Sequence, residues 1–160
     1  MVKASLTGKS SKANSDKYLV FDSGYRGWCN LELTDCKAFA GWLSYTCPWV
    51  FFVHVPNEGK RLGSVADLVE SGMIIGFSDY AILTAGHKHS FGLIEAKRKD
   101  RTKSAWRKGQ RECLQRAVDL GGFGAVGYGL DCLKSAAKIY LCGSDDDAIF
   151  VQYLAQHKEV

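Results

Sequence analysis

Two acidic residues and a lysine lie close to each other in a part of the sequence that is otherwise apolar. Asp79 is near the start of the apolar segment Ser78–Leu83, and Glu95 and Lys97 are near the end of a second one, Phe91–Lys97. Successive side chains of a strand point to opposite faces, so Glu95 and Lys97 share one face of the second predicted strand. If the two segments pair, Asp79 lies beside Glu95. Two carboxylates and an ammonium would then meet at one point.

The charges of such a site restrict its chemistry. Two like charges are costly to bury together unless a cation or protons neutralise them. Carboxylate oxygens are hard ligands that favour Mg²⁺ or Mn²⁺. The residues therefore predict a divalent-metal site, and the working hypothesis is hydrolysis of a phosphodiester bond.

A glutamine lies on the inward stripe of the following predicted helix. With Ser104 as its N-cap, this helix is expected to reach about Leu120. Its inward stripe then contains Trp106, Gln110, Cys113, Ala117 and Leu120. A polar amide that faces a core needs a partner, which here is the acid site, a metal-bound water, a phosphate or simply the backbone.

Basic residues are concentrated immediately after the second strand. The whole chain is only mildly basic, with a net charge of +4 and a pI near 8.7. Between positions 97 and 116, however, only Asp100 and Glu112 oppose a basic series made of Lys97, Arg98, Lys99, Arg101, Lys103, Arg107, Lys108, Arg111 and Arg116. This distribution is typical of a protein that binds a polyanion, although a solvated helix face has the same composition.

Length and composition indicate one ordinary globular domain. The 160 residues are enough for a single core. The polar segment 1–17 is predicted to be disordered, and 18–160 to form the domain. The 6 cysteines contain no CxxC pair, the N-terminus lacks a signal peptide, and no apolar run could span a membrane. We therefore expect a cytoplasmic protein with reduced thiols and no membrane association.

The remaining elements predict an α/β fold with a mixed sheet flanked by helices. Helices are predicted over Asp35–Tyr45 (with Thr34 as N-cap), from Ser64 to Gly72, and over Leu130–Leu141 and Ala148–Gln156. Strands are predicted over Tyr18–Phe21, Trp49–Val55 (fully buried) and Gly124–Gly127.

Taken in order, these motifs resemble the PD-(D/E)XK nuclease superfamily and, more narrowly, the VRR-NUC (virus-type replication-repair nuclease) family. The sequence reads Pro56-Asn57-Glu58-Gly59-Lys60-Arg61, then Gly76-Phe77-Ser78-Asp79, then Ile94-Glu95-Ala96-Lys97, then Gln110. The match extends from about Glu32 to Leu141. It implies a restriction-endonuclease-like core, with elements in the order αβββαβ.

The sequence departs from the family pattern at two places. Ser78 stands where the family usually has a proline. Relatives also carry a glutamate on the first helix, often followed by a glutamine. The candidates here are Glu32 and Asp35, with Cys36 where the glutamine would stand. We prefer Glu32 as the metal-side carboxylate.

The resemblance assigns a role to each site residue. Asp79 and Glu95, with the backbone carbonyl of Ala96, would hold one or two Mg²⁺ or Mn²⁺ ions. Lys97 would orient the attacking water or offset phosphate charge, and Gln110 would position the nucleophile. The phosphate backbone of DNA would be bound by Asn57, Lys60, Arg61, Arg98, Lys99, Arg101, Lys103, Arg107, Lys108 and Arg111.

These roles lead to one main expectation and two alternatives. The first is a metal-dependent DNA endonuclease that acts on double-stranded or branched DNA, such as flaps and junctions, in phage replication, recombination or repair. Relatives that act on symmetric junctions are commonly homodimers, so a homodimer is also expected. The alternatives are a nucleic-acid-binding protein of the same fold without strong catalysis, and a protein-interaction module whose acids are surface charges.

The histidines and a glycine-rich segment receive structural interpretations. His54 lies within an apolar strand and is interpreted as a core histidine. His87 and His89 flank Lys88 in a loop, with no acid or cysteine at zinc spacing. The segment Gly121–Gly129 lacks the context of a nucleotide-binding loop, so its glycines are assigned to turns and close packing.

Overall fold

A computed structural model describes residues 17–55 and 64–157. In chain order the elements are β1 (Leu19–Phe21), α1 (Glu32–Thr46), β2 (Phe52–His54), α2 (Val65–Glu70), β3 (Tyr80–Ile82), β4 (Gly92–Lys97), the 3-10 turn η1 (Arg101–Lys103), α3 (Gln110–Asp119), β5 (Phe123–Tyr128), α4 (Leu130–Cys142) and α5 (Asp147–Gln156). The segment 1–16 and the predicted phosphate contacts Asn57, Lys60 and Arg61 lie outside the described residues.

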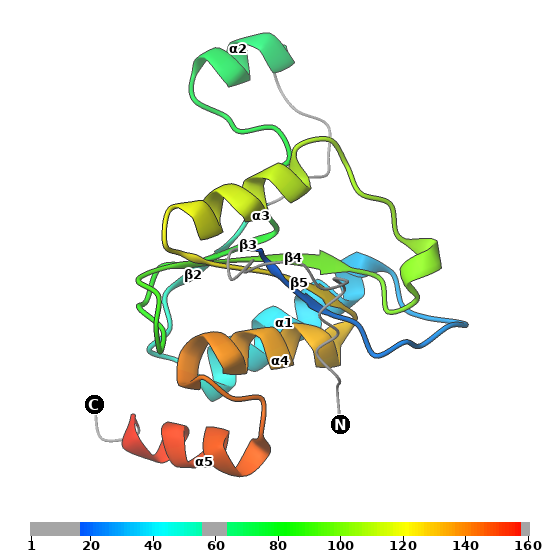
Figure 1. Ribbon diagram of the computed structural model, residues 1–160. Coiled ribbons are helices and arrows are strands. Elements are labelled where there is room, and N and C mark those ends of the chain that lie inside the picture. The colour runs from blue at the N-terminus through cyan, green and yellow to red at the C-terminus, as the bar shows by residue number, and fades with distance from the viewer. Residues whose placement is uncertain (1–16, 56–63, 158–160) are drawn as a thin grey trace, which may run out of the picture.

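The strands form one mixed sheet in the order β1-β5-β4-β3-β2. The central strand β4 pairs in parallel with β5 and antiparallel with β3, and the edge strands are β1, parallel to β5, and β2, antiparallel to β3. All six residues of β4 are buried. Figure 1 shows α3 on one face of the sheet and α1 and α4 on the other, with α5 beyond α4. The predicted mixed sheet flanked by helices is confirmed.

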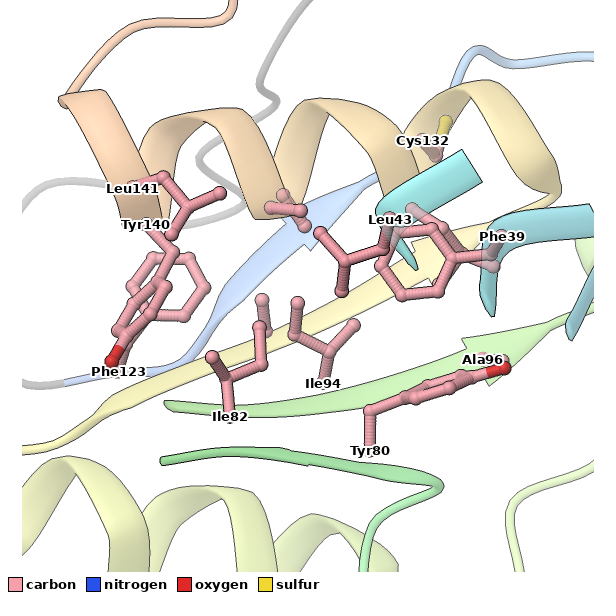
Figure 2. Packing of buried hydrophobic residues seen from close by; sticks show 14 of the residues in the cluster. Phe39, Leu43, Tyr80, Ile82, Ile94, Ala96, Phe123, Cys132, Tyr140 and Leu141 are labelled. Carbon is pink, nitrogen blue, oxygen red and sulfur yellow. The ribbon is translucent and has the colours of Figure 1, made fainter. Parts of the chain in front are cut away.

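The larger part of the core lies between the sheet and helices α1 and α4 (Figure 2). Phe39 and Leu43 project from α1, and both are fully buried against the strand residues Tyr80 and Ile94. The Tyr80 hydroxyl donates a hydrogen bond of 2.8 Å to the backbone carbonyl of Cys36, which ties β3 to α1. This contact fixes the start of α1 relative to the strand that follows Asp79.

A smaller apolar cluster lies under α3, on the opposite face. It consists of Leu93, Cys113, Leu114, Ala117, Val126 and Tyr128. Leu93 belongs to β4, and the next side chains of β4 on the same face are those of Glu95 and Lys97. Toward the carboxyl end of β4 the space under α3 is therefore occupied by charged rather than apolar side chains.

Two predicted helix starts were wrong. Helix α1 begins at Glu32, before the predicted cap Thr34, and Glu32 and Asp35 place their negative charges in its first turn, where the helix dipole favours them. Helix α3 begins only at Gln110, because Gly109 has a left-handed backbone with φ of 89°. The predicted cap Ser104 instead accepts the N–H of Arg98 at 2.8 Å.

The predicted buried strand Trp49–Val55 was also wrong in extent and burial. Only Phe52–His54 pairs, at the sheet edge, and Phe51 and Val53 are exposed. His54 is exposed as well, so it is not a core histidine. An apolar run does not distinguish a central strand from an edge strand, because both accept β-branched and aromatic residues.

A pair of glycines holds the segment before β3 against the start of α3. Gly76 and Gly109 have φ of 75° and 89°, and a Cβ on Gly109 would lie 2.3 Å from the carbonyl oxygen of Ile75. A Cβ on Gly76 would lie 2.4 Å from the carbonyl oxygen of Lys108. The two backbones touch, and any side chain would separate them.

We predict that Gly109→Ala lowers the free energy of unfolding by about 1–3 kcal/mol, because it adds both a strained φ and a backbone clash. Gly41→Ala is the control. Gly41 lies within α1 with nothing within 4 Å of its added Cβ, so this change should stabilise the protein by about 0.5–1 kcal/mol. Denaturant unfolding of both variants measures the difference. Equal stability of Gly109→Ala and the parent protein would contradict the close contact.

Candidate active site

The candidate site begins with two residues of the central strand. The side chains of Glu95 and Lys97 are 0% and 3% exposed and lie on the face that α3 covers. The Lys97 ammonium donates to Oε1 of Glu95 at 2.8 Å. Buried charges in proteins are stable only when they are paired and hydrogen-bonded. The strand therefore holds a polar pair that depends on partners from other elements.

Asp79 approaches the pair from the neighbouring strand. Tyr80 pairs with Ile94, so the same register places Asp79 opposite Glu95 and on the same face. The Asp79 carboxylate Oδ2 accepts the backbone N–H of Ala96 at 2.9 Å. In a strand the N–H and C=O of one residue lie on the same side, so the Ala96 carbonyl also faces the side of β3. The pairing that brings the two acids together was predicted from the sequence.

Gln110 completes the arrangement from the first residue of α3. Its Oε1 accepts from the Lys97 ammonium at 2.9 Å and from the backbone N–H of Arg107 at 2.8 Å. Its Nε2 donates to Oε1 of Glu95. Gln110 is 3% exposed, and both the oxygen and the nitrogen of its amide are hydrogen-bonded. Gln110 therefore contacts both members of the buried pair, on the inward side of the helix as its sequence position predicted.

The environment of Glu95 disfavours its ionised form. Burial, reinforced by the negative charge of Asp79, raises the pKa of the Glu95 carboxyl to about 8, against the opposing effect of Lys97. Glu32 also raises this pKa. The second carboxylate oxygen, Oε2, is buried and has no hydrogen-bond partner in the described part of the protein. A buried carboxylate oxygen without a donor is suited to a cation.

The donor set therefore fits a hard divalent cation. Asp79 and Glu95 supply carboxylate oxygens and Ala96 supplies a carbonyl, which together are the oxygen ligands that Mg²⁺ and Mn²⁺ prefer, with water filling other positions. Within residues 17–55 and 64–157, no group of three or more His, Cys, Asp or Glu side chains is gathered closely enough to hold a metal. The fit thus depends on the carbonyl and on water as well as on the acids.

The two candidates for the helix-borne acid occupy different positions. Glu32 is half-buried at the start of α1 and contributes to the potential at Glu95. Asp35 is 5% exposed and accepts from Nδ2 of Asn30 at 3.3 Å, so it caps the preceding loop. Of the two candidates, Glu32 is thus the one whose charge acts on Glu95.

The basic residues after β4 divide into two groups. Several make contacts within the fold. The Arg98 guanidinium donates to backbone carbonyls, and Lys103 contacts Asp100. Lys99 lies 3.7 Å from Asp131, and Arg101 lies 3.8 Å from Asp22. The other group lies at or just before α3 and consists of Arg107, Lys108 and Arg111, which are exposed. Lys99, Arg101 and Lys103 also keep 40–51% of their side chains exposed, so their structural contacts do not remove them from the surface.

Two residues near the site were missed by sequence reasoning. The Trp106 ring lies 5.2 Å from the Lys97 ammonium and 4.8 Å from the Arg111 guanidinium, measured from the ring centroid. Asp100 is 3% exposed, and hydrogen bonds from Thr102 and from the N–H of Gly27 lower its pKa to about 2. The signal for Asp100 was available, because it is an acid within a basic series and is followed two residues later by a threonine.

The remaining predictions about reactive residues concern cysteine and histidine. All 6 cysteines are free thiols. The ring nitrogen Nδ1 of His89 is 2.9 Å from the carbonyl oxygen of Gly121, which gives this loop histidine a structural contact. In the glycine-rich segment, a Cβ on Gly127 would lie 2.8 Å from the backbone N of Leu133, as expected for close packing.

None of the helices in the described ranges is both long and apolar enough to cross a membrane.

Comparison with known proteins identifies a structural relative. No protein-family model matches the chain, and no curated protein matches its sequence. A solved structure of a "VRR_NUC domain protein" is similar to it, with a TM-score of 0.59 and 20% sequence identity over 71% of this chain and 89% of that one. At this identity the likeness shows a shared fold. It confirms the restriction-endonuclease-like fold and agrees with the resemblance found in the motifs.

The raised pKa of Glu95 predicts how the stability of the metal-free protein depends on pH. Near Glu95 lie the charged groups Asp79, Glu32 and Lys97, and the folded state retains the Glu95 proton between its ordinary pKa of 4.5 and about 8. The unfolded chain releases this proton, so the stability gained from it is lost as the pH rises through that window. We expect the melting temperature in EDTA to fall over this range.

Glu95→Gln should remove this component of the pH dependence, because the amide cannot ionise. Glu112→Gln, an exposed position on α3, is the matched control and should follow the parent protein. Thermal melts at a series of pH values compare the three proteins. Parallel curves for the parent and Glu95→Gln would show that Glu95 does not titrate in this window.

Proposed function

We propose that this chain is a VRR-NUC-type nuclease, a divalent-metal-dependent endonuclease that hydrolyses phosphodiester bonds in DNA. The observation that carries the proposal is the state of Glu95. One of its oxygens is held by Lys97 and Gln110, and the other is buried next to Asp79 without a donor among the residues that the structure describes. A binding protein gains nothing from burying acids near phosphates, whereas a metal-dependent hydrolase requires it.

In the proposed mechanism Asp79, Glu95, the carbonyl of Ala96 and, from α1, Glu32 would hold Mg²⁺ or Mn²⁺. The bound ion supplies Lewis acidity and a water of lowered pKa. Lys97 offsets the charge that grows on the phosphate oxygens, since its ammonium is a compact point charge with three donors. Gln110 hydrogen-bonds to both Lys97 and Glu95 and fixes their relative positions. The ammonium and the carboxylate therefore present a constant geometry to the phosphate.

The basic side chains near the site would hold the DNA backbone. The exposed members Arg107, Lys108 and Arg111, together with Asn57, Lys60 and Arg61, would contact phosphates outside the cleavage site. Such contacts are largely independent of sequence and are weakened by salt. The resemblance supports double-stranded or branched DNA as the substrate, a role inside the cell in phage replication, recombination or repair, and a homodimer that acts on symmetric junctions.

We predict cleavage of supercoiled plasmid or of a synthetic four-way junction with Mg²⁺ or Mn²⁺ and none with EDTA. Asp79→Asn and Glu95→Gln should each abolish cleavage, because each removes a metal-binding carboxylate. Asp145→Asn, at an exposed position after α4, is the control and should cleave normally. Cleavage in EDTA would contradict the mechanism, and binding of DNA without cleavage by the parent protein would leave only a nucleic-acid-binding function.

Lys97→Ala should lower the cleavage rate by at least roughly a hundredfold, the scale of losing a key group that stabilises charge in the transition state. Lys88→Ala, at an exposed position in the loop between β3 and β4, is the matched control. Single-turnover cleavage measures the rate, and circular dichroism shows whether the variant is folded. A folded Lys97→Ala protein with a near-normal rate would remove Lys97 from the mechanism.

A further inference from the structure

The loop between β1 and α1 lies against the segment that follows the candidate active site (Figure 1). Asp100 accepts the backbone N–H of Gly27 at 2.8 Å, and the Lys103 ammonium donates to the carbonyl of the same glycine at 2.5 Å. The Arg98 guanidinium donates to the carbonyls of Cys29 and Asn30, each at 3.3 Å. Arg98 directly follows Lys97. The loop is therefore attached at several points to the end of the strand that carries the site.

Within this fixed loop, the side chain of Trp28 projects into solvent. Trp28 is 80% exposed, whereas the next residue, Cys29, is 7% exposed. The carbonyl of Trp28 accepts from the Tyr25 hydroxyl at 2.8 Å. Gly27 has φ of 145°, and a Cβ on it would lie 2.9 Å from that hydroxyl oxygen. The backbone on both sides of Trp28 is thus held in place while the indole itself is left uncovered.

The surroundings of Trp28 are cationic. Arg26, Lys99, Arg101 and Lys103 all lie in or against the loop, with 40–51% of each side chain exposed. They outnumber the aspartates that approach them at 3.6–3.9 Å, which are Asp22, Asp100 and Asp131, and surface pairs of this kind are weak. The Lys99 ammonium lies 5.2 Å from the centroid of the Tyr25 ring. Covering this surface with an apolar protein partner would desolvate these charges without balancing the excess of cations. A phosphate backbone would supply the anions, and a nucleobase would supply a flat apolar face for the indole.

We propose that Trp28 is a stacking platform for an unpaired nucleobase of the strand whose phosphate occupies the Asp79–Glu95 site. This inference rests on the proposed function, which assigns the phosphate to the Asp79–Glu95 site. A base inside an intact duplex has both faces covered by its neighbours, so away from the ends of the duplex only an unpaired base can offer a face to Trp28. Trp28 thereby favours DNA that carries unpaired bases beside the cleavage point.

The test compares binding to two fluorescein-labelled DNAs, a fully paired duplex and the same duplex with a short unpaired flap. Anisotropy is measured with Ca²⁺ in place of Mg²⁺, so binding is observed without relying on cleavage. Trp28→Ala should lose about 5- to 100-fold in affinity for the flap, the range for losing one base–aromatic stack, and change little on the duplex. Trp28→Phe should keep most of the flap affinity. Tyr45→Ala, at an aromatic position 90% exposed near the far end of α1, is the control.

The outcomes separate this inference from the proposed function. Unchanged flap affinity in Trp28→Ala, or an equal loss on both DNAs, overturns the inference, and cleavage by the parent protein with Mg²⁺ would leave the nuclease function standing. A selective loss on the flap supports the inference even if the parent protein cleaves nothing. A change of oligomeric state in Trp28→Ala, measured by light scattering, overturns the inference, because it would identify the surface as a contact between copies of the chain.

Discussion

The architecture depends on placing a carboxylate and an ammonium in the middle of a sheet. Glu95 and Lys97 belong to a strand whose residues are all buried, where an unpaired charge would be strongly destabilising. Each neighbour of the pair supplies part of the hydrogen bonding that these buried charges need. Gln110 offers an acceptor to the lysine and a donor to the glutamate. Within the described ranges Oε2 of Glu95 has no hydrogen-bond partner, and this oxygen is the basis for proposing a bound cation.

Three separate elements must be correctly placed for this arrangement to exist. The β3–β4 register sets Asp79 opposite Glu95, and the backbone contact between Gly76 and Gly109 fixes the segment before β3 against the start of α3. Gln110 directly follows Gly109, so a displacement there would move the amide away from Lys97. The geometry of the site is therefore set by backbone contacts more than by the side chains that perform the chemistry.

Sequence patterns predicted which candidate residues lie together better than they predicted the ends of the elements that carry them. Alternation along a strand was enough to place Glu95 and Lys97 together, and pairing of two neighbouring segments brought Asp79 to them. The start of α3 was missed because serine is a common N-cap residue, which favoured Ser104. Gly109 and the cations before it oppose helix formation upstream of Gln110. The edge position of β2 was missed since it depends on partners far away in the chain. The tie between Asp100 and Gly27 is likewise a long-range contact without a local pattern.

The parallel pairing of β1 with β5 has a consequence for the order of assembly. Leu19 lies next to Ala125, so β1 gains its place in the sheet only after most of the described chain has been synthesised. Contacts between distant segments form late because closing a long loop is entropically costly, whereas the β3–β4 hairpin is local and forms early. On the ribosome, the acids would thus come together well before β1 docks and brings its loop beside Arg98, Asp100 and Lys103. In a nascent chain, Glu95 and Lys97 would therefore lack part of their final surroundings until β5 has been synthesised.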